Sequence, residues 1–160
     1  MLLLHLKRFE FDFKTLLNAK ILTRHEFYDR INLKKYLTEE AQLKYGSDCE
    51  YILVNVMLHQ GRMSGAGHYF AFGKHNNRWY QFNDENVDIV DEGIMKLKSF
   101  GGTISKISPK LENFQCKRAE DSINSSAYML VYIKTSEFEN VMRPVDLSKI
   151  PAFIKTIVDE

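Results

Sequence analysis

The alternation of apolar and polar residues predicts a chain built mainly of β-strands. Leu2–Phe13 starts as an apolar run and then alternates Phe with acidic residues, which is the period of a half-exposed strand. Tyr51–His59 carries four aliphatic side chains on one face, and Ala127–Lys134 has the composition of a buried strand. Further strands are expected at Ala19–Phe27, His68–Gly73, Arg78–Asn83 and Asn86–Val90.

Helical spacing of apolar residues is confined to short stretches. Ile31–Leu43 follows this spacing after Asn32, which can cap a helix, and Gly46 with its polar neighbours ends it. One or two helical turns are expected near Ile94–Lys98, and a last helix from Pro151. Polar loops are expected over residues 61–67 and 99–126. Many antiparallel strands with few helices predict an α+β fold.

Composition limits the classes of function. The 160 residues are 44% hydrophobic and 27% charged, which suffices for one domain with its own core. The net charge of +1 does not favour nucleic acid or an anionic membrane as a partner. The apolar start is too short for a secretory signal or a membrane span. Two cysteines without a CxxC pair suit an intracellular protein of the cytoplasm or nucleus, with no metal site and no cofactor expected.

His68 is the histidine whose surroundings indicate chemistry. It follows a glycine-rich stretch and opens the segment GHYFAF. A hairpin turn centred between residues 75 and 76 would place Asn83 directly across from it, where a carboxamide oxygen could orient the imidazole. Asp84 would point to the other face of an ideal strand, unless the strand is bulged. The pair is two-thirds of a Cys-His-Asn arrangement, and an ordinary cross-strand polar pair is an equally good interpretation.

A nucleophile to go with His68 is not evident. Cys49 lies in a Gly-Ser-Asp loop and Cys116 in another polar loop, whereas a reactive thiolate is best placed at a helix N-terminus. Ser64 and the Ser125–Ser126 pair also lack the strand-turn-helix setting of a catalytic serine. We therefore expect no nucleophilic catalysis from these residues.

Four segments resemble the ubiquitin-specific proteases, which are papain-like cysteine deubiquitinases. They are LLLHLKRFEFD, YILVNVMLHQGRMSGAGHYFAF, RWYQFNDENV and SAYMLVYIK, in the family's order and spacing, and they cover most of residues 2–134. Shorter pieces, namely HEF, AYMLVYI and the IP of the tail, resemble the herpesvirus-associated subgroup. The resemblance implies the antiparallel, β-rich palm portion of such a catalytic domain.

The resemblance also implies functions for particular residues. His68 falls on the family's catalytic histidine, Asn83 on its partner and Asp84 on the acidic residue that often follows. The implied reaction is thiol-dependent hydrolysis of the (iso)peptide bond at the C-terminal glycine of ubiquitin, so the implied partners are ubiquitin and ubiquitinated proteins. The positions implied to line the channel for the ubiquitin tail are Phe9, His59, Gly65, Gly67 and Tyr69.

The chain departs from the family pattern in two respects. The family's Asn-Thr-Cys helix start is absent, so residues 1–135 resemble only the C-terminal half of the catalytic domain, followed by a tail at 136–160. Residues 98–126 are longer than the family pattern leads us to expect. A strand that begins at residue 2 suggests a chain cut from something larger, with the cysteine half as its partner. This chain alone is expected to be inactive, and the alternative function is a non-catalytic ubiquitin-binding or scaffold module.

Overall fold

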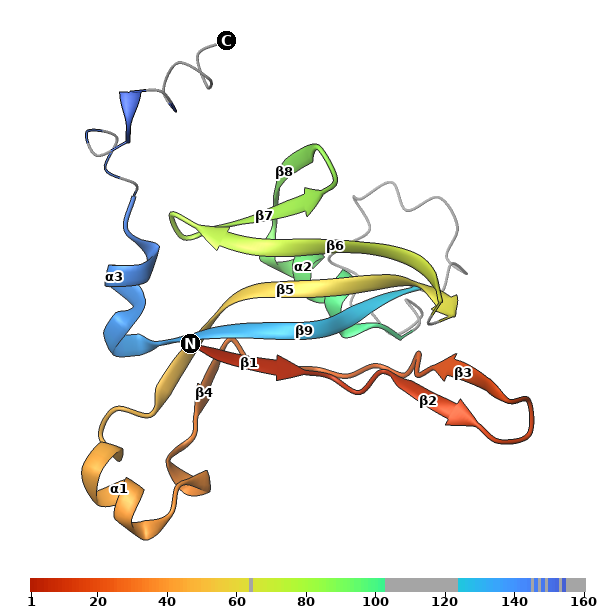
Figure 1. The fold of residues 1–160 in the computed structure, drawn as a ribbon, viewed down its shortest axis with the longest axis horizontal. Helices are drawn as coiled ribbons and strands as arrows, with labels where there is room; N and C mark the ends of the chain where they lie inside the picture. The colour runs from red at the N-terminus through yellow and green to blue at the C-terminus, as the bar shows by residue number, and fades with distance from the viewer. Residues whose placement is uncertain are drawn as a thin grey trace.

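The architecture is one antiparallel sheet with helices beyond one end of its strands and on one face (Figure 1). The structure is a computed structural model that describes residues 1–63, 65–102, 124–144, 146, 148, 150–152 and 154. The strands are β1 (Leu2–His5), β2 (Phe9–Asp12), β3 (Leu17–Lys20), β4 (Arg30–Asn32), β5 (Glu50–Met63), β6 (Ala66–His75), β7 (Arg78–Asn83), β8 (Asn86–Val90) and β9 (Ser125–Lys134). The helices are α1 (Glu39–Tyr45), α2 (Glu92–Phe100) and α3 (Phe138–Met142), with 3₁₀ turns at Lys34–Tyr36 and Thr135–Glu137. The predicted α+β, antiparallel fold is confirmed.

β5 is the strand around which the sheet is organised. The main path runs β1-β9-β5-β6-β7-β8, and β5 also pairs with β3 and β4. Its 14 residues are long enough to meet different partners at its two ends. β4 pairs with it from Glu50 to Ile52, whereas β6 pairs from Asn55 onward. One end of β5 therefore lies near α1, and its other end forms the hairpin with β6.

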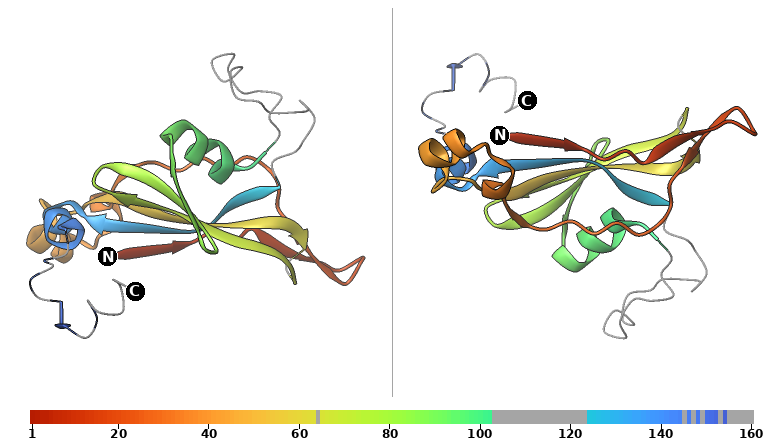
Figure 2. Two further views of the ribbon diagram at one scale, coloured as in Figure 1. Left: turned by 90° about the horizontal axis from the view of Figure 1, so that it is seen from above. Right: turned by 90° about the horizontal axis from the view of Figure 1, so that it is seen from below.

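The core lies between the sheet and α2, which covers one face (Figure 2). Val56 and Leu58 of β5 and Phe72 of β6 are fully buried and pack with Met95 of α2. Asp91 caps α2 by accepting a hydrogen bond from the Gly93 amide at 2.7 Å. Burial of such side chains contributes roughly 1.5–3 kcal/mol each, so this layer holds β5, β6 and α2 in fixed relative positions.

The prediction of one continuous strand over Leu2–Phe13 is wrong. Leu2–Phe13 forms two strands, because Leu6–Arg8 between β1 and β2 belong to neither. Arg8 is buried, and its guanidinium donates a hydrogen bond to the Thr23 carbonyl at 2.6 Å. The next strand also differs from its expected span of 19–27, since β3 begins at Leu17 and ends at Lys20.

The helix predicted over Ile31–Leu43 is wrong as a single element. Arg30–Asn32 is a strand, because it pairs with the start of β5. Asn32 Oδ1 accepts a hydrogen bond from the Lys34 amide at 2.9 Å, but the N-cap residue of the 3₁₀ turn is Leu33, not Asn32. Leu37 is extended, and Thr38 then caps α1. Pairing with β5 thus overrides the helical spacing at the start of the segment.

The expected loops are corrected in three places. Residues 61–67 are mostly strand, since β5 continues to Met63 and β6 begins at Ala66, with a register irregularity after Gln60. Of the expected loop at 99–126, residues up to Phe100 belong to α2 and β9 starts at Ser125, while residues 103–123 lie outside the described residues. The helix expected from Pro151 lies largely outside them too.

Candidate functional site

The hairpin of β6 and β7 brings His68 and Asn83 into contact. Its turn is Asn76–Asn77, both with positive φ, one residue later than expected, so the register is shifted by two residues and the two are not directly opposite. A shift of two keeps a side chain on the same face. His68 Nε2 lies 2.5 Å from Asn83 Oδ1, so the expected contact is present despite the error in register.

Asp84 also reaches His68, by a route that an ideal strand would not allow. It occupies the turn between β7 and β8 with φ of 51°, a backbone conformation that is uncommon outside glycine. Its Oδ2 lies 3.8 Å from His68 Nε2, and its side chain is 73% exposed against 43% for His68. The tight turn therefore brings Asp84 to the face of the sheet that carries His68, as a bulge would have done. As a result, side-chain oxygens of Asn83 and Asp84 both face Nε2 of His68.

This geometry determines what the imidazole of His68 can do. When Nε2 carries the proton and donates to Asn83, Nδ1 holds a lone pair that can accept a proton from another group. The side chain of His68 is 43% exposed, so part of the ring is open to solvent. The arrangement is thus suited to general base and acid chemistry.

Three of the predicted channel residues form an aromatic cluster next to this pair. The His59 ring is 5.3 Å from Phe9 and 4.8 Å from Tyr69, and Tyr128 of β9 completes the cluster at 5.9 Å from Tyr69. His59 is 1% exposed, whereas Tyr69 is 48% exposed. His59 therefore forms the buried floor of the cluster, and Tyr69 forms its solvent-exposed side.

The two predicted glycines differ in their surroundings. A Cβ added to Gly67 would lie 2.2 Å from His59 Nε2 and 2.5 Å from the Gln60 carbonyl oxygen. No heavy atom would lie within 4 Å of a Cβ on Gly65, among the parts of the chain with described placement. The structure therefore places Gly67 against the cluster and leaves Gly65 outside it.

Lys20 belongs to the same region, although no pattern in the sequence points to it. It is 8% exposed, and its Nζ donates to the carbonyl oxygens of His59 at 2.6 Å and Asn124 at 3.0 Å. Burial, with a smaller contribution from the charge of Arg8, lowers the pKa of Lys20 to about 8. Burial and then the charge of Lys20 also lower the pKa of His59, so this imidazole is held neutral.

Cys49 is remote from His68. Its thiol is buried and donates to the Tyr45 carbonyl at 2.9 Å, just before β5. His68 pairs with Gln60 near the other end of β5. Since each strand residue adds about 3.3 Å, the path along β5 from Cys49 to Gln60 is about 35 Å. Cys49 therefore cannot be the reaction partner of His68 in this fold, and Cys116 lies outside the described residues.

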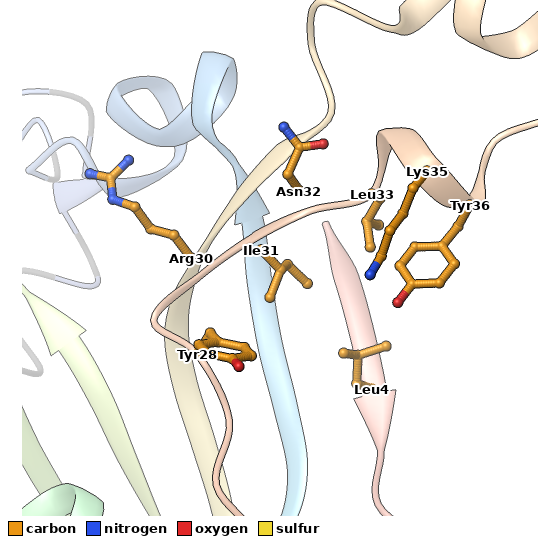
Figure 3. A pocket seen from close by; sticks show the side chains of 8 residues that line it. All are labelled: Leu4, Tyr28, Arg30, Ile31, Asn32, Leu33, Lys35 and Tyr36. Carbon is orange, nitrogen blue, oxygen red and sulfur yellow. The ribbon is translucent and has the colours of Figure 1, made fainter.

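A surface pocket lies at the Cys49 end of β5 (Figure 3). Its lining residues come from β1, from β4 with its flanks, and from the 3₁₀ turn, and they are Leu4, Tyr28, Arg30, Ile31, Asn32, Leu33, Lys35 and Tyr36. It contains none of the predicted site residues. Within the described parts of the chain, no group of three or more His, Cys, Asp or Glu could hold a metal ion. No helix in those parts has the length and apolar character that crossing a membrane requires.

Comparison with known families agrees with the fold. The family model described as "Ubiquitin carboxyl-terminal hydrolase" matches residues 1–132, which include β1 to β8 and all but the last two residues of β9. The chain therefore belongs to the ubiquitin carboxyl-terminal hydrolase family, as the resemblance of its segments implied.

Individual relatives support the same assignment. The chain is 32% identical over 154 residues to ubiquitin carboxyl-terminal hydrolase 5 of Schizosaccharomyces pombe, covering 95% of this chain and 13% of that protein. It is 36% identical over 149 residues to ubiquitin carboxyl-terminal hydrolase 7 of Drosophila melanogaster, covering 92% of this chain and 12% of that protein. For ubiquitin carboxyl-terminal hydrolase 15 of Saccharomyces cerevisiae the identity is 32% over 174 residues, covering 98% of this chain and 14% of that protein. The chain thus spans about an eighth of the length of these relatives.

Proposed function

We propose that this chain is the histidine-bearing, C-terminal half of the catalytic domain of a thiol-dependent deubiquitinase of the herpesvirus-associated subgroup. The observation that carries the proposal is the contact of His68 with Asn83, 2.5 Å apart, beside the cluster of His59 and Tyr69 in a chain of this family. The substrates are ubiquitin conjugates, cleaved after the last glycine of ubiquitin. The nucleophilic cysteine is supplied by the other half of the catalytic domain, which is the partner that this half requires.

In the proposed reaction His68 moves protons and Asn83 orients it. His68 Nδ1 takes the proton of the thiol, whose sulfur bonds to the carbonyl carbon of the terminal glycine. When the C–N bond breaks, Nδ1 returns that proton to the leaving amine and a thioester remains. Water then attacks the thioester while His68 accepts a proton from it, and cleavage of the C–S bond restores the thiol and releases a carboxylate.

The proposed route of the ubiquitin tail runs over the cluster of Phe9, His59 and Tyr69. Glycine at position 67 lets the β6 backbone approach His59 closely, since any side chain there would meet the ring. A shallow channel between an exposed tyrosine and a side-chain-free backbone admits a glycine-glycine tail and excludes larger residues. Asp84, next to His68 Nε2, supplies negative charge that stabilises the imidazolium formed during the reaction.

A second candidate function is supported by the position of Cys49. Because this thiol is buried and remote from His68, the 160-residue chain could serve as a ubiquitin-binding or scaffold module without catalysis. The two candidates differ in one respect, which is whether a cysteine from another segment meets His68.

The test is a ubiquitin probe that carries a cysteine-reactive group at its C-terminus. The chain alone, and its Cys49→Ser and Cys116→Ser variants, should bind the probe without covalent labelling. When the cysteine-bearing half is joined to the chain, the probe should label that half and ubiquitin conjugates should be hydrolysed. Labelling of the chain alone that disappears in either serine variant would overturn the proposal, and so would hydrolysis that persists without the second half.

A further inference from the structure

Lys20 is a buried charged group that the proposed mechanism does not use. It is the last residue of β3 and lies directly opposite Phe9 in the ladder of β2 and β3. Among the described residues, no carboxylate lies within ion-pair distance of its ammonium group. Burying an unpaired lysine is costly, so the hydrogen bonds that it makes must compensate. Their positions indicate what Lys20 does.

Both hydrogen bonds of Lys20 go to main-chain carbonyls that flank the candidate site. One acceptor is His59 on β5, at 2.6 Å, and the other is Asn124, at 3.0 Å, immediately before β9. The Asn124 carbonyl also accepts from the Gly61 amide at 3.1 Å. One ammonium group thus ties β3, β5 and the start of β9 together, at the residue whose ring forms the base of the aromatic cluster.

The contact of His59 with Gly67 makes this tie relevant to substrate binding. Because a Cβ at Gly67 would lie 2.2 Å from His59 Nε2, the ring and the β6 backbone have no space between them. A shift of the β5 backbone at His59 would therefore displace β6 at Gly67 and, two residues on, Tyr69. β3 meets β5 in the sheet through the single pair Ala19–Met63, so that pairing holds β3 in place only weakly.

We propose that Lys20 is a positioning residue of the ubiquitin-tail site. Its ammonium group fixes the position of the His59 backbone and so the distance between the His59 ring and the Gly67 backbone. This distance sets the width of the channel between Phe9, His59 and Tyr69. This inference rests on the proposed function for its ligand, but the tie between Lys20 and His59 can be tested without any ligand.

The first experiment follows the free chain by NMR. The His59 ring resonances should show an inflection near pH 8, where Lys20 titrates, and Lys20→Met should abolish that inflection. The Gly61 amide should exchange with solvent about 10- to 100-fold faster in Lys20→Met, because charge-assisted hydrogen bonds hold its acceptor in place. Lys20→Arg keeps the charge and the donors and should restore most of the protection.

The control is Lys134→Met, which removes a lysine from the far end of β9. Lys134 pairs with Asp48 at 2.8 Å, near the Cys49 end of β5, so its loss should leave His59 and Gly61 unchanged. Equal effects of the two methionine variants would show general destabilisation and would overturn the proposal. An unchanged His59 inflection in Lys20→Met would also overturn it.

The second experiment measures the Kd of ubiquitin for each variant. Lys20→Met should weaken binding about 10-fold or more, Lys20→Arg should restore it in large part, and Lys134→Met should leave it unchanged. If the His59 ring resonances respond to the titration of Lys20 but the wild-type chain binds no ubiquitin, the proposed function fails. The contact between Lys20 and His59 would still be supported. If ubiquitin binds equally to the unchanged chain and to Lys20→Met, the positioning role fails and the proposed function stands.

Discussion

His59 and His68 lie on paired, adjacent strands yet occupy opposite kinds of environment. His68 is half-exposed, and its Nε2 faces a carboxamide oxygen and a carboxylate oxygen. His59 is 1% exposed, and no hydrogen-bond partner of its Nδ1 is found in the described part of the chain. Burial lowers the pKa of His59 and keeps it neutral. In the proposed function, His68 exchanges protons and needs access and an orienting partner, whereas His59 shapes the channel and needs packing.

The largest effect that this comparison predicts is the loss of turnover in His68→Ala. In the enzyme that joins this chain to its cysteine half, kcat should fall about 10²- to 10⁴-fold, because general base and acid transfer is lost. The measurement is hydrolysis of a ubiquitin C-terminal amide, with circular dichroism to show an intact fold. His75→Ala, an exposed histidine at the other end of β6, is the control and should turn over normally. Near-normal turnover of His68→Ala would contradict the assignment.

The next effect concerns stability around the buried histidine. Gly67→Ala should destabilise the fold by about 1–3 kcal/mol, because its methyl group would overlap with the His59 ring and the Gln60 carbonyl. Gly65→Ala adds the same methyl group in open space and should change stability by less than about 0.5 kcal/mol. Urea unfolding of both variants measures the difference. Equal stability would mean that the β6 backbone does not press on His59.

A smaller effect is expected from the partner of His68. Asn83→Ala removes a hydrogen bond whose net contribution is about 0.5–1.5 kcal/mol, so turnover should fall about 3- to 10-fold. Asn83→Asp keeps an oxygen acceptor at the same distance and should remain close to the unchanged enzyme. Steady-state kinetics on the joined enzyme measures both. If Asn83→Ala were as inactive as His68→Ala, the carboxamide would do more than orient the ring.

The smallest expected effect is a dependence of stability on acid. An unfolded His59 takes up a proton near its ordinary pKa of 6.5, but the folded state lowers that pKa through burial. As the pH falls below about 6.5, the unfolded state therefore binds more protons and the free energy of unfolding decreases. His59→Gln removes the titrating group and should make this decrease smaller, which urea titrations between pH 7 and pH 5 can measure. An unaltered acid profile would contradict the pKa shift.

The strands that carry the site could be predicted from sequence because their alternation is strong. Tyr51–His59 and Arg78–Asn83 are strands where expected, and the turn between β6 and β7 was placed within one residue. The contact of His68 with Asn83 was predicted from a register in error by two residues. It holds because side chains alternate with a period of two, and an error of one residue would have put Asn83 on the other face.

Features that depend on distant partners could not be predicted. Nothing in the pattern around Lys20 indicates burial, because its acceptors at His59 and Asn124 come from segments far along the chain. Ile31 and Asn32 stand at the start of the predicted helix but are extended, since β5 offers them a ladder of hydrogen bonds. Asp84 reaches His68 through a turn with positive φ, which periodicity does not reveal. For Lys20 and for Ile31–Asn32, tertiary contacts override a local preference.

The pairing of β1 has a consequence for synthesis on the ribosome. β1 pairs with β9, with Leu2 opposite Tyr132, and with no other strand that the structure describes. At about 5–20 residues per second, the ribosome needs roughly 7 to 25 s to make the intervening chain. During that time the apolar residues Leu2 to Leu4 have no strand to pair with, and contacts between such distant segments form slowly. A nascent chain halted before β9 should therefore bind chaperones strongly, and one extended past Lys134 should not.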